Sequence, residues 1–259
     1  MKVLVTCPPM LGMMDELQAV FKQAGVEVHC PSVVQTLSEE KLIEIVPEYD
    51  GWIIGDDPAT AGVFRAGRNG NLKAAVKWGI GVDNVDFEAC QELNIPITNT
   101  PMMFGNEVAD LAMCYVGVLA RHVFEIHSGI LNGDWPKPRG ISLVGRTLGV
   151  VGFGDIGKNV GRRAIAAGMN VIAYDPFAAD EAGLEVVRLE WPSNIEQCDF
   201  IVFTCSLNKH NYHMLNTDML RLTKRGVRII NVARGQLIDE EALVLALRSG
   251  QVHSAALDV

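Results

Sequence analysis

The sequence lacks the features that mark secreted, metal-binding and nucleic-acid-binding proteins. Its 259 residues include six cysteines with no CxxC spacing, which favours a reduced, cytoplasmic protein with buried thiols over a disulfide or zinc framework. There is no basic stripe, and the net charge of −9 argues against nucleic acid as a partner. No set of His, Cys and Asp residues has metal-ligand spacing, so we expect no metal, and we interpret the adjacent Asp56 and Asp57 as a turn cap.

Long hydrophobic runs are missing as well. The longest apolar region, residues 102–120, contains Asn106, Glu107 and Asp110 and therefore does not predict a membrane-spanning helix. The opening residues MKVLVTCPPM are too short and too interrupted for a signal peptide. With 49% hydrophobic and 20% charged residues, the composition is typical of one large or two medium-sized globular domains, and we expect no membrane partner.

Short apolar runs alternate with amphipathic segments along most of the chain, a pattern typical of parallel βαβ units. In the first hundred residues the pattern predicts strands at 3–6, 26–29, 51–54 and 72–78, and helices at 15–24, 38–46 and 86–93. Beyond residue 147 it predicts six strands, at 148–151, 170–174, 185–188, 199–204, 227–231 and 254–259. Six strands suffice for a doubly wound parallel sheet. The proline-bounded hexapeptide PITNTP at 96–101 is interpreted as a hinge.

The most informative motif is GFGDIG at residues 152–157, which lies between a predicted strand and a helical segment. In this context Gly152 permits a tight turn, Gly154 leaves room for the backbone to approach a pyrophosphate, and Gly157 lets helix and strand pack closely. The phosphates would lie at the N-terminus of the helix that begins near Ile156, where free N–H groups and the helix dipole favour an anion. The motif therefore predicts dinucleotide binding.

A single acid, Asp175, follows the next predicted strand and selects the cofactor. A carboxylate there can accept both ribose hydroxyls of NAD. The 2′-phosphate of NADP would instead meet a like charge, at a cost of roughly 1–4 kcal/mol for a separation of about 4 Å. The segment that follows, PFAA at 176–179, has no Arg or Lys to compensate. The sequence therefore predicts NAD.

An arginine follows the apolar strand predicted at 227–231, in the run NVARG. From the residues alone, Arg234 is equally well explained as a solvated loop residue or as an anion-binding group, since its planar fork suits a carboxylate. Its position near the predicted dinucleotide site favours the functional interpretation.

These motifs together carry a resemblance that covers the whole chain. VVGFGDIG, YDP, NVARG, LIDEEAL, SAALDV and the upstream KWGIGVDNVD resemble the D-isomer-specific 2-hydroxyacid dehydrogenase family, in particular its D-3-phosphoglycerate dehydrogenase-like branch. The resemblance implies an α/β protein with a smaller flavodoxin-like substrate domain at 1–99 and a Rossmann-type NAD-binding domain at 100–259. It also implies hydride transfer between the nicotinamide and C2 of a 2-hydroxy or 2-oxo acid, whose identity the sequence leaves open.

The resemblance implies roles for individual residues. Arg234 matches the catalytic arginine that holds the substrate carboxylate, and Gly79 and Gly81 match the loop whose backbone N–H groups bind the same carboxylate, with Ile80 beside the nicotinamide. Asp155 and Ile156 match the pyrophosphate-contacting pair, and Asp258 matches the residue that holds the nicotinamide carboxamide. Cys205 stands where relatives often have Thr, and its weak S–H donor makes that hydrogen bond to the cofactor weaker. The full set of expected cofactor-binding residues is Gly152, Gly154, Asp155, Ile156, Gly157, Asp175, Cys205, Val232, Ala233 and Asp258.

The resemblance further implies two residues that this sequence does not contain. In the family an acid–base histidine and its glutamate partner follow shortly after the ALDV strand, whereas the sequence ends at Val259. We therefore expect a fragment of a longer enzyme, with a nonenzymatic NAD-binding sensor or scaffold as the alternative. Five of the six histidines lack a nearby glutamate in a motif context and are interpreted as ordinary surface or core residues: His122, His127, His210, His213 and His253.

A long helix predicted at 106–127 has more apolar residues than one core-facing stripe needs. Some lie off the stripe, at Met113, Cys114 and Val116. In the family that the sequence resembles, this region pairs two subunits, so we expect a homodimer. The predicted stripe consists of Val108, Leu111, Ala112, Tyr115, Val118 and Leu119.

Overall fold

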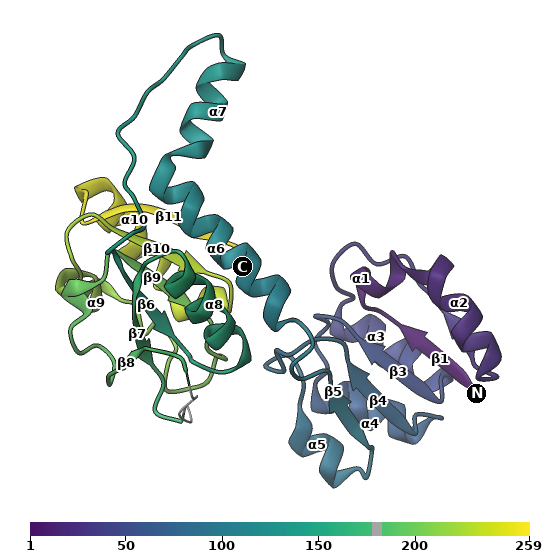
Figure 1. Ribbon diagram of the computed structural model, residues 1–259. Helices are drawn as coiled ribbons and strands as arrows, with labels where there is room; N and C mark the ends of the chain where they lie inside the picture. Colours follow the sequence, from purple (N-terminus) through teal and green to yellow (C-terminus); the bar gives the residue numbers. More distant parts are fainter. Residues whose placement is uncertain (178–182) are drawn as a thin grey trace. The chain divides into compact units, whose positions relative to one another are not determined.

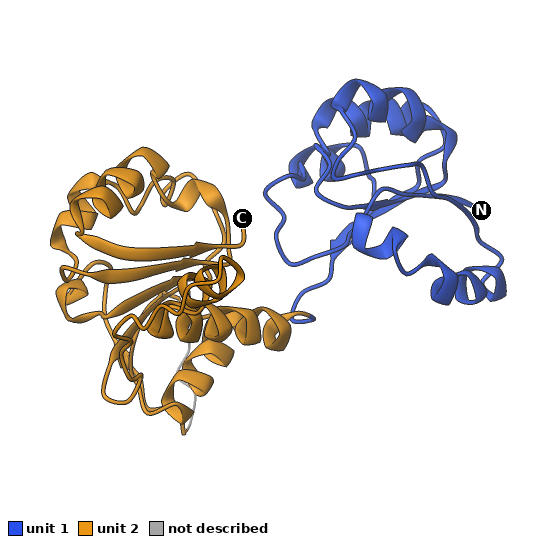
Figure 2. Cartoon of the chain, turned by 90° about the horizontal axis from the view of Figure 1, so that it is seen from above, with its two compact units in different colours: residues 1–103 blue, residues 104–259 orange. Residues whose placement is uncertain are grey.

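A computed structural model describes residues 1–177 and 183–259 of the chain. Within these residues the chain forms two compact units, residues 1–103 and residues 104–259, which Figure 2 distinguishes by colour. Each unit is built on its own parallel sheet, one of five strands and one of six. The α/β fold class predicted from the sequence is therefore confirmed.

Unit 1 contains the five-stranded sheet, in the order β2-β1-β3-β4-β5 (Figure 1). This is the flavodoxin-like order expected for the smaller domain. Its strands are β1 (Lys2–Val5), β2 (Glu27–His29), β3 (Gly51–Ile54), β4 (Ala74–Lys77) and β5 (Ile97–Asn99). Its helices are α1 (Pro8–Leu11), α2 (Met14–Gln23), α3 (Glu39–Ile45), the short 3-10 helix η1 (Val46–Glu48), α4 (Ala61–Asn69) and α5 (Phe87–Glu92).

The sequence patterns missed three elements of unit 1. Helix α4 contains two glycines and an asparagine and thus has low helix propensity, but it is stabilised by its buried residues Val63 and Phe64. Helix α1 is a single turn that begins with two prolines. Strand β5 lies inside the hexapeptide interpreted as a hinge: Thr98 pairs with Val76 of β4, and the unit ends at Met103.

Unit 2 contains the six-stranded sheet, in the order β11-β10-β9-β6-β7-β8. Its strands begin and end within two residues of the six predicted: β6 (Thr147–Val151), β7 (Asn170–Tyr174), β8 (Val187–Arg188), β9 (Phe200–Phe203), β10 (Val227–Asn231) and β11 (Val252–Leu257). Its helices are α6 (Gly105–Arg121), α7 (Val123–Leu131), α8 (Asp155–Ala166), α9 (Thr217–Leu222) and α10 (Glu240–Ser249), with 3-10 helices η2 (Ile195–Gln197) and η3 (Gly235–Leu237). Apolar cores fill both faces of the sheet, as a doubly wound fold requires.

The helix predicted at 106–127 is two helices. Helix α6 ends where His122 adopts a left-handed conformation with φ of 56°, and α7 begins at Val123. Helix α6 packs against α8 (Figure 1) through a face of small residues that the predicted stripe matched only at Ala112 and Leu119. That face consists of Gly105, Ala109, Ala112, Val116, Leu119 and Ala120.

The cysteines and the helix lengths bear on the remaining expectations. All six cysteines are free thiols, but Cys30 and Cys114 are exposed, so the prediction that the thiols are buried was wrong for these two. None of the helices in residues 1–177 and 183–259 is long and apolar enough to cross a membrane.

Candidate functional site

The glycine-rich loop begins where β6 ends and turns directly into α8. Gly152 has φ of +89°, and a Cβ there would lie 2.5 Å from the backbone nitrogen of Cys205. A Cβ on Gly157 would overlap the carbonyl oxygen of Gly152, so helix and strand approach each other as the motif predicts. Gly154 precedes the first residue of α8 and has open space around it. These features fit a pyrophosphate at the unpaired N–H groups of α8.

Asp155 occupies the first position of α8, but its side chain is directed into the protein. One carboxylate oxygen accepts a hydrogen bond of 3.2 Å from Asn159 Nδ2. The other, Oδ2, is buried without a hydrogen-bond partner, and it lies where a Cβ on Gly105 would be. Any contact that Asp155 makes with a pyrophosphate would therefore come from its backbone N–H, as for Ile156 after it.

Asp175 lies at the end of β7 and is joined to the glycine-rich loop. Its Oδ2 accepts a hydrogen bond of 2.7 Å from the backbone N–H of Phe153, and its Oδ1 accepts one of 2.8 Å from Phe177. Each carboxylate oxygen has a second lone pair, so the group can still accept hydroxyl donors. The two local motifs thus meet at one place, although part of the PFAA segment, residues 178 and 179, lies outside the described residues.

Two residues at the end of β9 contact the first turn of this loop. The hydroxyl of Thr204 donates to the carbonyl oxygen of Gly152 at 2.6 Å, which sequence reasoning missed because the two residues are 52 apart in the chain. Cys205 is half-buried beside Gly152, and its Sγ lies 3.8 Å from Asn211 Nδ2. Burial raises the pKa of the Cys205 thiol to about 11, so it remains a neutral, weak donor at physiological pH.

Asn231, the last residue of β10, shapes the turn that carries Arg234. Its side-chain Oδ1 accepts from the backbone N–H of Ala233 at 3.0 Å, and its Nδ2 donates to the carbonyl oxygen of Arg234 at 2.8 Å. Val232 and Ala233 are both buried, whereas Arg234 is half-buried and its Nη1 donates to the Ala233 carbonyl at 2.7 Å. The spacing of the motif did not single out this buried asparagine.

Asp258 follows β11 and is exposed, and two contacts fix it. Its backbone N–H donates to the carbonyl oxygen of Asn231 at 2.9 Å, and its Oδ1 accepts from the hydroxyl of Tyr115 on α6 at 3.4 Å. Partial burial, followed by the nearby Asp258 carboxylate, raises the pKa of Tyr115, which keeps its hydroxyl protonated as a donor. Tyr115 was expected only as an apolar stripe residue.

All of the predicted unit 2 positions therefore gather at the carboxyl edge of one sheet. The strand order reverses between β6 and β9, and in open α/β sheets the crevice at such a reversal is where dinucleotides bind. Gly152, Cys205 and Asp175 follow the strands at and beside that reversal, while Arg234 and Asp258 follow the next two strands outward. The arrangement can hold an extended ligand with a central pyrophosphate.

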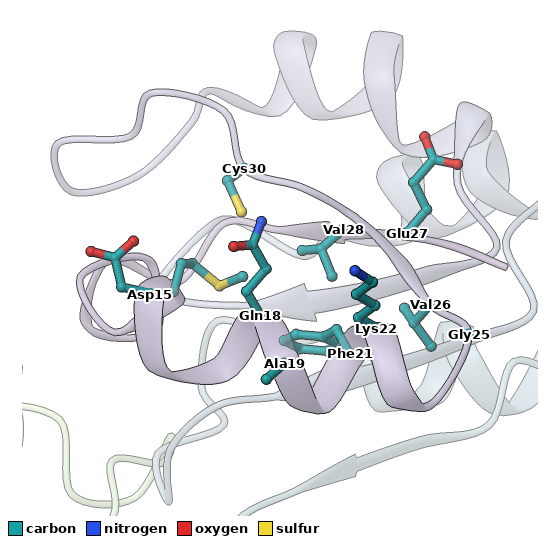
Figure 3. A pocket seen from close by; sticks show the side chains of 11 residues that line it. Asp15, Gln18, Ala19, Phe21, Lys22, Gly25, Val26, Glu27, Val28 and Cys30 are labelled. Atoms are coloured by element: carbon teal, nitrogen blue, oxygen red, sulfur yellow. The ribbon is translucent and has the colours of Figure 1, made fainter.

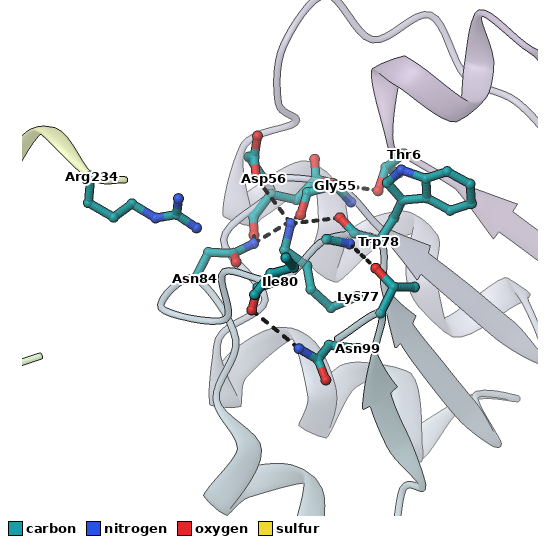
Figure 4. A network of polar contacts seen from close by, with 12 residues as sticks. Thr6, Gly55, Asp56, Lys77, Trp78, Ile80, Asn84, Asn99 and Arg234 are labelled. Carbon is teal, nitrogen blue, oxygen red and sulfur yellow. Dashed lines mark hydrogen bonds and ion pairs between the residues drawn. The ribbon is translucent and has the colours of Figure 1, made fainter. Parts of the chain in front are cut away.

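Gly79, Ile80 and Gly81 form the loop that follows β4 in unit 1. The backbone N–H of Gly79 donates to Thr100 Oγ1 at 2.9 Å, and the Ile80 carbonyl accepts from Asn99 Nδ2 at 3.2 Å (Figure 4). Gly79 is thus already paired, which leaves the N–H groups of Ile80 and Gly81 as the donors available for an anion in this described loop. The expectation that the Gly79 N–H binds a carboxylate needs this pairing with Thr100 to break.

A buried polar network supports the same loop from the end of β3. Asn84 Nδ2 donates to the carbonyl oxygens of Gly55 at 3.1 Å and Asp57 at 2.7 Å. The Asp57 carboxylate accepts from Thr6 Oγ1 and from the backbone N–H groups of Gly55 and Leu37. The interpretation of the two acids as a turn cap accounts for Asp57, whereas Asp56 pairs with Lys77.

The histidines show one pairing that the sequence did not predict. His122 Nδ1 lies 3.2 Å from Glu125, and its ring packs edge-on against His253, with centroids 5.2 Å apart. His253 lies within β11, not before it, and partial burial and Arg228 lower its pKa. This cluster lies at the junction of α6 and α7, away from the carboxyl edge of the sheet.

A groove of about 980 Å³ lies between α2 and β2 in unit 1 (Figure 3). It is lined by both charged and apolar side chains, including Gln18, Phe21, Lys22 and Cys30. None of its lining residues belongs to the motifs described above, so it is separate from the candidate site.

Comparisons with known proteins bear on these features. The family model described as D-isomer specific 2-hydroxyacid dehydrogenase, NAD binding domain, matches residues 113–259. A hydroxypyruvate reductase of Thermotoga maritima is 39% identical over 226 residues, which cover 86% of this chain and 73% of that protein. A D-3-phosphoglycerate dehydrogenase of Methanocaldococcus jannaschii is 35% identical over 265 residues, which cover the whole of this chain and 48% of that protein.

A solved structure matches the fold over the full length of the chain. The NAD⁺-bound 3-phosphoglycerate dehydrogenase of Entamoeba histolytica has a TM-score of 0.83 and 28% sequence identity, and the match covers 100% of this chain and 80% of that one. This chain thus spans about half of one curated relative and about three quarters of the other.

Proposed function

The chain belongs to the D-isomer specific 2-hydroxyacid dehydrogenase family, and we propose that it is an NAD-dependent oxidoreductase that interconverts a 2-hydroxy acid and a 2-oxo acid. The observation that carries the proposal is the junction of Asp175 with the glycine-rich loop, at a hydrogen-bond distance of 2.7 Å. It brings the ribose-binding acid and the pyrophosphate-binding turn to one crevice of an NAD-binding domain. NAD is accordingly the cofactor.

The proposed roles of the cofactor-binding residues follow from their placement. Gly152, Gly154 and Gly157 let the backbone approach the pyrophosphate, and the first N–H groups of α8 donate to it. Asp175 accepts hydrogen bonds from the ribose hydroxyls. Further along the sheet edge, Cys205, Val232 and Ala233 line the crevice, and Asp258 accepts a hydrogen bond from the nicotinamide carboxamide. The bound nicotinamide supplies or accepts the hydride.

Arg234 is the residue we propose to hold the substrate carboxylate. Its guanidinium offers a planar pair of N–H donors, and the Asn231 side chain fixes the backbone that carries it. In unit 1 the backbone N–H groups of Ile80 and Gly81 are proposed to bind a carboxylate as well. The substrate is therefore a small 2-hydroxy or 2-oxo acid, in keeping with the names of both curated relatives and with the D-3-phosphoglycerate dehydrogenase-like branch.

We also propose that the protein is a homodimer that pairs through α7 and the segment after it. These elements expose large apolar side chains that the unit itself does not cover: Phe124 (62% exposed), Ile130 (57%), Leu131 (73%) and Trp135 (80%). Sedimentation of a well-folded monomer at high protein concentration would contradict this proposal.

Two measurements test the proposed activity. Fluorescence titration with NADH tests the cofactor site, and oxidation of NADH in the presence of hydroxypyruvate, glyoxylate and pyruvate tests the reaction. Arg234→Gln shortens the side chain and removes its charge, so it should weaken binding of the 2-oxo acid and leave the NADH affinity unchanged. Binding of NADH without binding of any 2-oxo acid to the NADH-saturated chain would favour an NAD-binding sensor or scaffold instead.

A further inference from the structure

A buried lysine lies under the loop of residues 79–81, and none of the roles proposed so far uses it. Lys77 is the last residue of β4, and its side chain is only 3% exposed. Its ammonium group donates to Asp56 Oδ1 and to the carbonyl oxygen of Trp78, both at 3.1 Å (Figure 4). A Cβ on Gly79 would lie 3.4 Å from Lys77 Nζ, so the charge sits directly beneath the start of the loop.

The partner of this lysine is in a different environment. The Asp56 side chain is 75% exposed, whereas the neighbouring Asp57 is fully buried and engaged by three donors. Water screens the charge of an exposed carboxylate more strongly than that of a buried ammonium. The field of Lys77 at the loop is therefore screened less than the field of Asp56.

We propose that the Lys77–Asp56 ion pair sets the affinity of this loop for carboxylates and its preference for ligands with one negative charge. The ammonium attracts an anion bound at the Ile80 and Gly81 N–H groups, and the Asp56 carboxylate offsets part of that attraction. Neither side chain has to touch the ligand. The inference rests on the proposed binding of a 2-oxo acid and adds the determinant of charge selectivity.

The signs of two substitutions separate this electrostatic role from a structural one. Lys77→Met removes the attraction and should weaken anion binding, whereas Asp56→Asn removes the offset and should strengthen it. If the pair only holds the loop in shape, both substitutions loosen the loop and both weaken binding. Asp56 is exposed, so Asp56→Asn leaves no unpaired acceptor in the core.

The experiment measures binding of oxamate, an unreactive analogue of a 2-oxo acid with one carboxylate, to the full chain saturated with NADH. We expect Lys77→Met to raise the dissociation constant and Asp56→Asn to lower it, each by about three- to tenfold at low ionic strength. Oxalate, which has two charges, should gain more than oxamate from Asp56→Asn. Salt should reduce both effects.

Matched controls come from the opposite end of the same sheet. Asp50, just before β3, pairs with Lys73, just before β4, at 2.7 Å, so Asp50→Asn and Lys73→Met make the same charge changes away from the loop. These variants should leave oxamate binding unchanged, and Lys77→Arg should restore most of the binding that Lys77→Met loses.

Two outcomes overturn the inference. Weaker oxamate binding in both Lys77→Met and Asp56→Asn would assign the pair a purely structural role. Equal responses of the Asp56→Asn and Asp50→Asn variants would show a general charge effect. A chain that binds NADH but neither oxamate nor oxalate would instead contradict the proposed function itself, so the two failures are distinguishable.

Discussion

The two units hold their carboxyl-edge loops in place by different physical means. In unit 2 the glycine-rich loop is fixed by close backbone contacts, because Gly152 and Gly157 approach atoms that no side chain could tolerate. In unit 1 the loop after β4 is fixed by side-chain hydrogen bonds: the Asn84 and Asn99 amides donate, and Thr100 Oγ1 accepts from the Gly79 N–H. The dinucleotide turn is therefore specified by the absence of side chains, and the loop of unit 1 by their presence.

The two sheets also differ in how much apolar core covers their faces. Both faces of the unit 2 sheet carry large buried cores. In unit 1 the face under α3, α4 and α5 has a core built around Trp52 and Phe64, whereas the other face has a small cluster, and α2 on that face has no buried residue. For the two loops, we expect the glycine-rich turn of unit 2 to tolerate the loss of a polar side chain better than added bulk, and the loop after β4 in unit 1 to show the reverse.

The largest effect should come from Gly157→Ala in unit 2. The added methyl group would overlap the Gly152 carbonyl, so we expect the free energy of unfolding to fall by about 2–4 kcal/mol. We also expect NAD binding to be lost. Thermal unfolding and NADH titration measure the two effects. Gly154→Ala is the matched control, because its Cβ meets open space: NADH affinity should fall while the melting temperature stays unchanged. A stable Gly157→Ala variant that binds NADH would contradict the conclusion that close backbone contacts fix the glycine-rich loop.

The next largest effect should come from Asp57→Ala in unit 1. The substitution leaves Thr6, Gly55 and Leu37 with unpaired donors, and burial of such groups costs about 1–3 kcal/mol. Chemical unfolding followed by circular dichroism should show the loss, whereas NADH affinity, which we propose to depend on unit 2, should not change. A loss of NADH affinity in Asp57→Ala would contradict the expectation that NADH binding depends on unit 2 alone.

Asp175→Ala tests the carboxylate that accepts a hydrogen bond from the dinucleotide turn. Loss of the ribose-binding carboxylate should weaken NADH binding by about tenfold, or roughly 1–2 kcal/mol, and narrow the gap between NADH and NADPH. Titration with both cofactors measures the change. Asp218→Ala, which removes an exposed acid on α9, should leave both affinities as they are.

The smallest effect concerns the thiols, of which each unit has one exposed and at least one buried. Burial raises the pKa of Cys90 to about 12 in unit 1 and those of Cys198 and Cys205 to about 11 in unit 2. At pH 8, iodoacetamide should label Cys30 and Cys114 first, as mass spectrometry would show. Because these pKa values are raised in the folded state, the free energy of unfolding should be unaffected by the three thiols below about pH 8.5. It should fall as the pH rises towards about 11 for Cys198 and Cys205 and about 12 for Cys90. Rapid labelling of Cys205 would contradict its placement beside Gly152.

The sequence predicted most of what depends on local pattern. The strands of unit 2 are continuous apolar runs bounded by turns, and the glycine motif and Asp175 are about 20 residues apart, so spacing alone identified them. Thr204, Asn231 and Asn84 were missed because their roles are hydrogen bonds to backbone groups, which appear only once the strands are adjacent. The break between α6 and α7 was missed because no glycine or proline marks it: His122 itself adopts the left-handed conformation.

Asn231 has a consequence for any attempt to redesign the reaction. Its side chain accepts from the backbone N–H of Ala233 and donates to the carbonyl oxygen of Arg234, and its own carbonyl oxygen accepts from the backbone N–H of Asp258. Asn231 therefore holds the backbone of both Arg234, proposed to bind the substrate carboxylate, and Asp258, proposed to bind the nicotinamide carboxamide. Libraries that vary positions 232–234 to change the substrate should keep Asn231. A substitution there would displace the proposed contacts to the substrate carboxylate and to the nicotinamide at the same time.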